Sequence, residues 1–174
     1  MRPDTRCTAQ GRLDTPLGVL ALRATDRGLA AVLFDAQKYH PGEIDAPVAP
    51  GHPHIALAAR ELAGYFAGRT RRFSVPLDPL GTPFQQAVWQ ALLEIACGEV
   101  RSYGDIARRI GRPAAVRAVG AAVGRNPLTI IVPCHRVVGS DGSLTGFASG
   151  LPRKRALLAL EGSLTGELNP ELSV

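Results

Sequence analysis

The stretch NPLTIIVPCHRVV, residues 126–138, decides the fold of the second half of this chain. Its β-prone part, residues 129–132, is typical of a short buried strand. Pro133 follows, and proline suits the first position of a helical turn because its missing N–H would be unpaired there anyway. We therefore expect the chain to turn at Pro133, which places Cys134 beside the unpaired backbone N–H groups of that turn.

Cys134 is followed directly by His135. A thiol beside backbone N–H groups and a histidine is expected to have a lowered pKa and to act as a nucleophile. The alternative is a buried free cysteine that packs as a small hydrophobe, and the residue type alone favours it. The Pro-Cys-His-Arg context favours the reactive thiol. The histidine then needs an orienting acceptor, for which Glu161 at the end of an apolar helix is the best candidate, while acids in turns, such as Asp141, stay open.

Length and composition limit the class of protein. The 174 residues are enough for one ordinary domain or two small ones. No apolar run reaches the length of a membrane span, and the N-terminus has no secretory signal. Three widely spaced cysteines indicate neither a disulfide framework nor a zinc site. We expect a cytoplasmic protein without a metal site.

The positive charge is concentrated in residues 101–125. This segment holds six arginines and one acid, Asp105, and so accounts for the whole net charge of +5. Ser102 can cap a first short helix that stops at Gly111, and a second helix runs from Arg112-Pro113 to Gly124. Two such helices joined by a tight turn predict a helix-turn-helix. The second is almost wholly Ala, Val and Gly, which suits close approach to a groove, although a solvated or core-packed helix is the alternative.

The first half of the chain predicts a small separate domain. Residues 17–34 contain two apolar runs around a turn, typical of a hairpin or the start of a meander, and residues 54–67 have helical periodicity. Residues 1–16 are polar, and we expect them to be frayed. Residues 74–80 indicate a short strand before a linker. The expected fold class is α+β: a β-meander/helix domain, 1–80, then a mostly helical domain, 81–174, with the helix-turn-helix and a short active-site strand.

The later helices complete that second domain. Thr82 and Pro83 predict the start of a helix with Val88, Leu92 and Ile95 on its apolar face, and Trp89 is expected in the core. Pro152 predicts the start of a last helix, and residues 163–174 are expected to form a loose tail.

These motifs together resemble the O6-alkylguanine-DNA alkyltransferase family, also called methylated-DNA–protein-cysteine methyltransferase. The resemblance is carried by IVPCHRVVG, with SYGDIA, RAVG and GRNP upstream and RKRALLALEG downstream, and it covers residues 83–162. The N-terminal TPLGVLALRATDRGLAAVLF is similar to the small β-domain of the family, more weakly.

The resemblance implies a role for each motif residue. Cys134 would accept the alkyl group, His135 would deprotonate it through a water, and Glu161 would orient the histidine. Asn126 would be a structural amide, and Tyr103 would give its proton to the guanine ring. Residues implied at the DNA are Arg117, which would fill the gap left by a flipped nucleotide, with Ala118, Ser102, Arg125 and Arg136. Residues implied at the substrate pocket are Phe147, Ala148, Ser149, Val132 and Pro133.

The resemblance also implies the reaction and the partners. The protein would repair DNA by direct reversal, taking the alkyl group of O6-alkylguanine irreversibly, once per molecule and without a cofactor. O4-alkylthymine is a further candidate substrate. The partner would be double-stranded DNA, bound through the minor groove by a monomer, with cooperative binding left open. A non-catalytic sensor of alkylated DNA is the alternative, against which the presence of Cys134 argues, and a cysteine hydrolase would not explain the basic helix-turn-helix.

The chain departs from the family pattern at a few positions. Its pocket loop reads GFASG, residues 146–150, where GYSGG is common. Leu160 stands where a histidine is common, and Val123 where bacterial relatives carry a polar residue. These departures bear on the size of the alkyl group and on the rate, and they leave the nucleophile unchanged.

Overall fold

The computed structural model describes residues 5–163, which fall into two compact units. The first contains the residues up to Leu80 together with Pro127–Ile131, and the second contains Gly81–Asn126 and the residues from Val132 onward. The sequence did not indicate that Pro127–Ile131 would group with the first unit. The predicted tail, apart from Ser163, lies outside the described residues.

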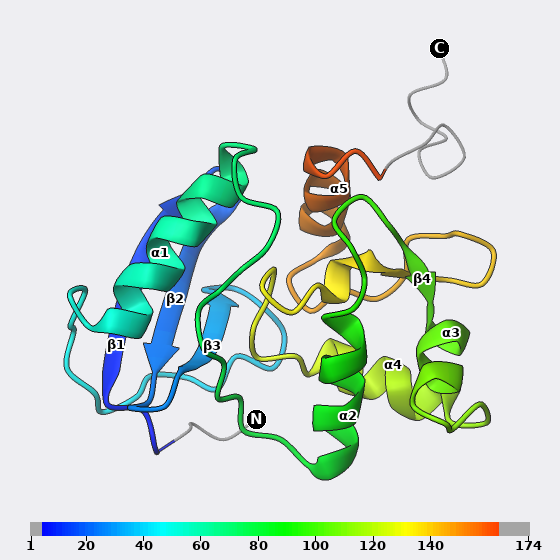
Figure 1. Ribbon diagram of the computed structural model, residues 1–174, viewed down its shortest axis with the longest axis horizontal. Coiled ribbons are helices and arrows are strands. Elements are labelled where there is room, and N and C mark those ends of the chain that lie inside the picture. Colours follow the sequence, from blue (N-terminus) through cyan, green and yellow to red (C-terminus); the bar gives the residue numbers. More distant parts are fainter. Residues whose placement is uncertain (1–4, 164–174) are drawn as a thin grey trace. The chain divides into compact units, whose positions relative to one another are not determined.

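The first unit is a three-stranded antiparallel sheet covered by a helix (Figure 1). The sheet order is β1-β2-β3, and its elements are β1 Ala9–Thr15, β2 Gly18–Ala24, β3 Leu29–Phe34 and the covering helix α1 Pro53–Phe66. Every residue of β3 is buried. Gly11 lies under α1, where a Cβ would come within 2.8 Å of Ile55, so the glycine permits the close approach.

The predicted hairpin and helix of this unit are confirmed, but two local predictions are wrong. Residues 9–15 form strand β1 although the segment is polar, because it pairs along its whole length with β2, from Ala9 opposite Ala24 to Thr15 opposite Gly18. Residues 74–80 form no strand, and only Leu77 bridges to Leu29.

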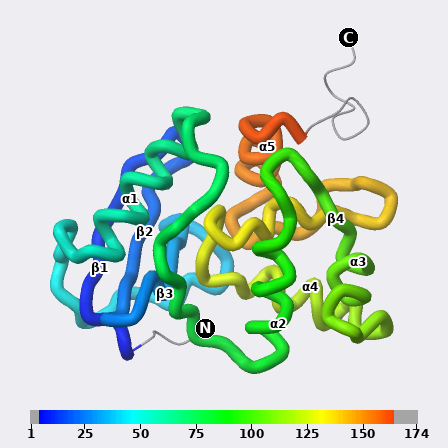
Figure 2. The backbone as a smooth tube through the Cα atoms, in the orientation of Figure 1, coloured from blue at the N-terminus to red at the C-terminus, as the bar shows by residue number. Residues whose placement is uncertain are grey.

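The second unit consists of helices around a two-stranded parallel pair (Figure 2). In chain order its elements are α2 Pro83–Leu92, β4 Arg101–Ser102, α3 Tyr103–Arg109, α4 Val116–Gly124, the 3-10 turn η1 Cys134–Arg136, β5 Val137–Val138 and α5 Leu151–Leu160. The expected α+β class is therefore confirmed. Trp89 is buried in the core as predicted, and its Nε1 donates to Ala122 O at 2.9 Å, which fixes α2 against α4.

The helix starts follow local capping chemistry. Thr82 accepts from the backbone N–H of Gln85, while the Gln85 side chain accepts from Thr82 N, so two otherwise unpaired donors are satisfied. Ser102 and Asp105 make the same reciprocal pair at the start of α3. The helix α4 begins at Val116, later than the predicted Arg112-Pro113.

The short strand predicted over residues 129–132 is wrong. The chain makes an isolated bridge between Leu128 and Val32 and then reverses at Ile130, whose φ is +75°. A β-branched residue rarely adopts a positive φ, so this turn is imposed by its surroundings and not by local preference. The strand near the nucleophile is instead β5, which follows it.

None of the helices within residues 5–163 combines the length and the apolar character needed to cross a bilayer.

Candidate active site

The nucleophile turn, Cys134–Arg136, is one turn of 3-10 helix. The predicted turn is confirmed, with Pro133 as its N-cap and not its first residue. Pro133 O accepts from Arg136 N at 3.0 Å and closes the turn. Cys134 is 5% exposed and His135 is 0% exposed, so both side chains lie in the interior of the second unit.

Asn126 holds the sulfur from the end of the α4 segment. Its Nδ2 donates to Cys134 Sγ at 3.1 Å and to Val132 O at 2.8 Å, and the side chain is buried. One amide thus fixes the backbone just before the turn and supplies a donor to the sulfur. A donor stabilises a thiolate more than a thiol, so Asn126 favours ionisation of Cys134.

His135 and Glu161 form a buried pair. His135 Nε2 lies 2.8 Å from Glu161 Oε1. Burial would raise the pKa of Glu161, but hydrogen bonds from His135 and Arg136 outweigh it and hold that pKa well below its usual range. The carboxylate can then only accept, so Nε2 carries the proton.

The second nitrogen of His135 is therefore the basic one. Burial lowers the pKa of His135, more than Glu161 raises it, and the ring is neutral at pH 7. Its Nδ1 is buried and makes no hydrogen bond with the described residues. A neutral imidazole whose Nε2–H is held by a carboxylate presents a lone pair at Nδ1, the arrangement that a general base requires.

Arg136 completes this buried cluster. Its Nε donates to Glu161 Oε2 at 2.8 Å, Nη2 donates to Oε1 at 2.9 Å, and Nη1 donates to Ile95 O at 2.5 Å. The predicted role of Arg136 at the DNA is wrong for this structure, because the side chain is 7% exposed and its donors are directed inward. The arginine instead fixes Glu161, and the forked pair balances both charges.

Tyr103 is placed near the nucleophile turn by strand pairing. β4 pairs in parallel with β5, with Arg101 opposite Val137, and Tyr103 directly follows β4. Its hydroxyl donates to Thr145 O at 3.2 Å. Burial raises the pKa of Tyr103, and the charge of Cys134 adds to this effect, so the phenol keeps its proton at pH 7.

The thiol itself differs from the sequence-based expectation. Burial raises the pKa of Cys134 and is the largest effect on it. The Asn126 amide, the charge of Lys154 and the backbone N–H groups of Cys134 and His135 all act to lower it, but do not outweigh burial. The predicted net lowering is therefore wrong for this closed site, although the backbone donors act in the predicted direction.

Comparison with known proteins gives the chain a family. The family model described as "6-O-methylguanine DNA methyltransferase, DNA binding domain" matches residues 83–163, and the "ribonuclease-like domain" of the same description matches residues 10–79. The methylated-DNA--protein-cysteine methyltransferase of Mycobacterium tuberculosis is 50% identical over 151 residues, 87% of this chain and 90% of that protein. The chain belongs to this family. Its enzyme class is accordingly that of a methylated-DNA–protein-cysteine methyltransferase.

Further relatives extend this result. The methyltransferase of the same description from Methanosarcina acetivorans is 49% identical over 152 residues, 86% of this chain and 96% of that protein. A solved structure, Mycobacterium tuberculosis OGT in complex with DNA, matches with a TM-score of 0.85 and 48% identity over 90% of this chain and 94% of that one.

The remaining predicted residues of this methyltransferase lie in two groups. Arg117, Ala118 and Arg125 are exposed along α4 and at its end, and Ser102 is occupied in capping α3. The structure does not test their contact with DNA. In the loop before α5, Phe147 and Ala148 are half-buried and Ser149 is buried, and on the other side Val132 and Pro133 are buried before the nucleophile.

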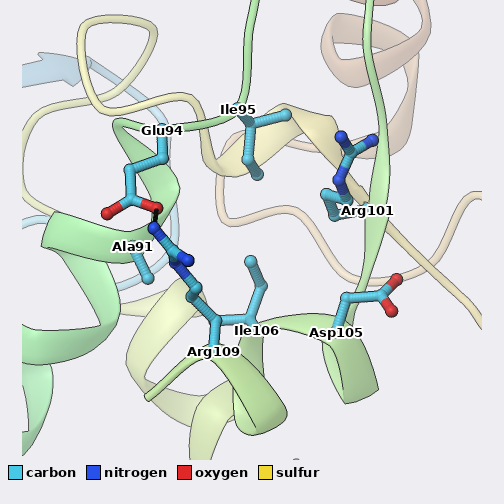
Figure 3. Close-up of a pocket in the computed structure, with 7 residues that line it drawn as sticks. All are labelled: Ala91, Glu94, Ile95, Arg101, Asp105, Ile106 and Arg109. Atoms are coloured by element: carbon cyan, nitrogen blue, oxygen red, sulfur yellow. Dashed lines mark ion pairs between the residues drawn. The ribbon is translucent and has the colours of Figure 1, made fainter.

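A separate cavity of about 260 Å³ lies between the end of α2 and α3 (Figure 3). Its floor is apolar, with Ile95 and Ile106, and charged side chains form its rim. There Arg109 pairs with Glu94, and none of the predicted site residues lines it. It is therefore not the site of alkyl transfer.

Sequence reasoning missed one buried cation, Lys154. The signal was present, because Lys154 precedes Leu157 and Leu158 by three and four residues and Glu161 by seven, so all four share one helical face. All four are buried, on a helix whose charged residues suggested a solvated surface.

Across residues 5–163, no group of three or more His, Cys, Asp or Glu side chains is arranged to hold a metal ion.

Proposed function

We propose that this chain repairs DNA by direct reversal, taking the alkyl group of O6-alkylguanine onto Cys134 in one irreversible step. The observation that carries the proposal is the arrangement of Asn126 on the sulfur and Glu161 on His135 in a chain of this family. The names of the relatives agree with the reaction: one transfers methyl groups from methylated DNA to a protein cysteine, and a similar structure contains DNA.

The chemical step is an in-line displacement on the alkyl carbon. Cys134 loses its proton toward His135 Nδ1 through a water, and the thiolate forms an S–C bond while the C–O6 bond breaks. The electron pair goes to the guanine, and Tyr103 gives its proton to the ring so that neutral guanine leaves. The product is a thioether, which no neighbouring group can cleave, so each molecule reacts once.

The buried position of Cys134 requires the base to leave the duplex. A stacked base cannot reach a nucleophile that is 5% exposed, so we propose that the nucleotide is flipped out. The exposed face of α4 supports minor-groove binding, because Ala118 and Ala121 are small enough to let the helix backbone approach the groove closely. Arg117, on the same helix, would fill the space that the nucleotide leaves.

The test of this function is the mass of the intact protein. After incubation with a duplex that contains one O6-methylguanine, we expect each molecule to gain one methyl group and no more, located on the peptide with Cys134. An unmodified duplex of the same sequence is the control. Unchanged mass with retained binding would favour the alternative function, a sensor of alkylated DNA. A duplex with O4-methylthymine tests the second candidate substrate in the same way.

The role of Arg117 gives a separate prediction. Arg117→Ala should slow reaction with alkylated duplex about tenfold or more, because unstacking a base costs a few kcal/mol and 1.4 kcal/mol corresponds to a factor of ten. Reaction with free O6-benzylguanine, which needs no flipping, should not change. The measurement is the single-turnover rate on both substrates.

A charge-matched variant makes this test specific. Arg112→Ala removes the same charge from the loop between α3 and α4, and should weaken salt-dependent binding without changing the ratio of the two rates. Equal losses on both substrates in Arg117→Ala would contradict the flipping role.

We also propose that the protein acts as a monomer in the cytoplasm. A reducing compartment agrees with three cysteines, Cys7, Cys97 and Cys134, that form no disulfide. Sedimentation with duplexes of increasing length distinguishes single binding from cooperative binding of several copies.

A further inference from the structure

Lys154, in α5, is fully buried. The chain has only one other lysine, Lys38, and all its other basic residues are arginines. A lysine ammonium is compact and strongly hydrated, so its burial needs compensation from polar or charged neighbours. The position of this lysine in the interior of the second unit therefore requires an explanation.

Two backbone carbonyls hold the ammonium group. Nζ donates to Val137 O at 2.5 Å and to Thr145 O at 2.7 Å. Val137 immediately follows the nucleophile turn, and Thr145 precedes the loop that carries Phe147. The Thr145 carbonyl also accepts from Tyr103, so the ammonium lies where the nucleophile turn, the pocket loop and the proposed proton donor meet.

These carbonyls solvate the ammonium but carry no net charge. Within residues 5–163, no carboxylate lies at ion-pair distance from Lys154, and the nearby Glu161 is bound by His135 and Arg136. Burial lowers the pKa of Lys154 to about 8, and the charge of Cys134 acts in the opposite direction. The ammonium thus stays mostly protonated at pH 7, and an ionised Cys134 is the charge that balances it.

The other charged and titratable groups around Cys134 cannot take this role. Arg136 is neutralised by Glu161, while His135 and Tyr103 are neutral at pH 7. Lys154 is thus the cation whose charge remains to act on the sulfur.

We propose that Lys154 is the counter-cation of the ionised Cys134, held by the Val137 and Thr145 carbonyls at a fixed place beside the nucleophile. It acts on the sulfur through space, so it is a positioning residue and donates no proton in the reaction. The inference rests on the proposed function only in naming Cys134 as the nucleophile. Its tests need no alkylated DNA, so it can fail while alkyl transfer succeeds, and the reverse.

The direct test is the ionisation of Cys134 in Lys154→Met. Thiolate absorbance is titrated with pH, and the signal of the matching Cys134→Ser protein is subtracted, so that only Cys134 is followed. We expect the Cys134 pKa to rise by about one unit or more in Lys154→Met, with a tenfold lower thiolate fraction at pH 7 for each unit. Arg155→Met, which removes a charge from the next position of α5, should leave the titration unchanged.

The reciprocal test avoids any change at Lys154. Lysine labelled at Cε with ¹³C gives two signals in this chain, from Lys154 and from Lys38 as an internal control. Cys134→Ser removes the balancing thiolate with almost no change of volume, so the pKa of Lys154 should fall while that of Lys38 stays constant.

The outcomes separate the two roles that Lys154 could have. A Lys154 pKa that is the same in the Cys134→Ser variant as in the unchanged protein would overturn the proposal, even if Lys154→Met failed to fold. So would a folded Lys154→Met protein with an unchanged Cys134 titration, because Lys154 would then only hold the two carbonyls. A shift in both measurements establishes the coupling.

Discussion

Cys134→Ser should abolish alkyl transfer while the protein keeps its fold and its affinity for DNA. The serine hydroxyl fills nearly the same volume, so the closely packed turn around Cys134 should tolerate it. A hydroxyl has a far higher pKa than a thiol, and burial raises it further, so no alkoxide forms near pH 7. We expect no added methyl in the intact mass, with unchanged fluorescence anisotropy on labelled duplex.

A second cysteine of the same unit is the matched control. Cys97 is a half-exposed free thiol, and Cys97→Ser should transfer the methyl group at the rate of the unchanged protein. If Cys134→Ser unfolded, the original alternative of a cysteine that serves only to pack would regain support. Transfer that persisted in Cys134→Ser would place the acceptor elsewhere.

Local chemistry explains which parts of this site the sequence could predict. The capping pairs at Thr82 and Ser102 involve residues three positions apart, so short patterns are enough to place the starts of α2 and α3. The turn after Pro133 follows in the same way from one residue type. The pair of His135 with Glu161 was predicted because an acid at the end of an apolar helix must find a partner.

The errors concern residues whose state depends on distant partners. A β-branched run predicted a strand over residues 129–132, but Ile130 is held at positive φ by tertiary packing. Arg136 was assigned to DNA because arginine is usually exposed, and its true partners, Glu161 and Ile95, lie 25 and 41 positions away in the sequence. The burial of Lys154 has the same origin, since its acceptors belong to other elements.

Glu161→Gln should lower both stability and rate. The substitution keeps the shape of the side chain but leaves Arg136 as a buried charge without a counter-charge, and breaking such a pair costs about 3 kcal/mol or more. His135 also loses the carboxylate that fixes its Nε2–H, so Nδ1 is a poorer base. We expect alkyl transfer about a hundredfold slower or more, since general base catalysis contributes at least that factor. Urea unfolding and single-turnover rates measure the two effects.

The pH dependence of stability should change as well. The pKa of Glu161 is held below its unfolded value of about 4.3, so its stabilising effect is present above that pH and is lost as the pH falls through the folded pKa. The lowered pKa of His135 acts in the same direction, because the unfolded chain takes up that proton below about pH 6.5. Glu161→Gln removes the first contribution, so its stability should decline less steeply below about pH 5.

A double variant separates the two functions of the carboxylate. Glu161→Gln with Arg136→Met removes the unbalanced charge, so part of the lost stability should return, as is common when a buried ion pair is replaced by apolar groups of similar size. The rate should stay low, because His135 still lacks its carboxylate. If the rate recovered together with the stability, Glu161 would act only by maintaining the fold, and the proposed general base would have to be reassigned.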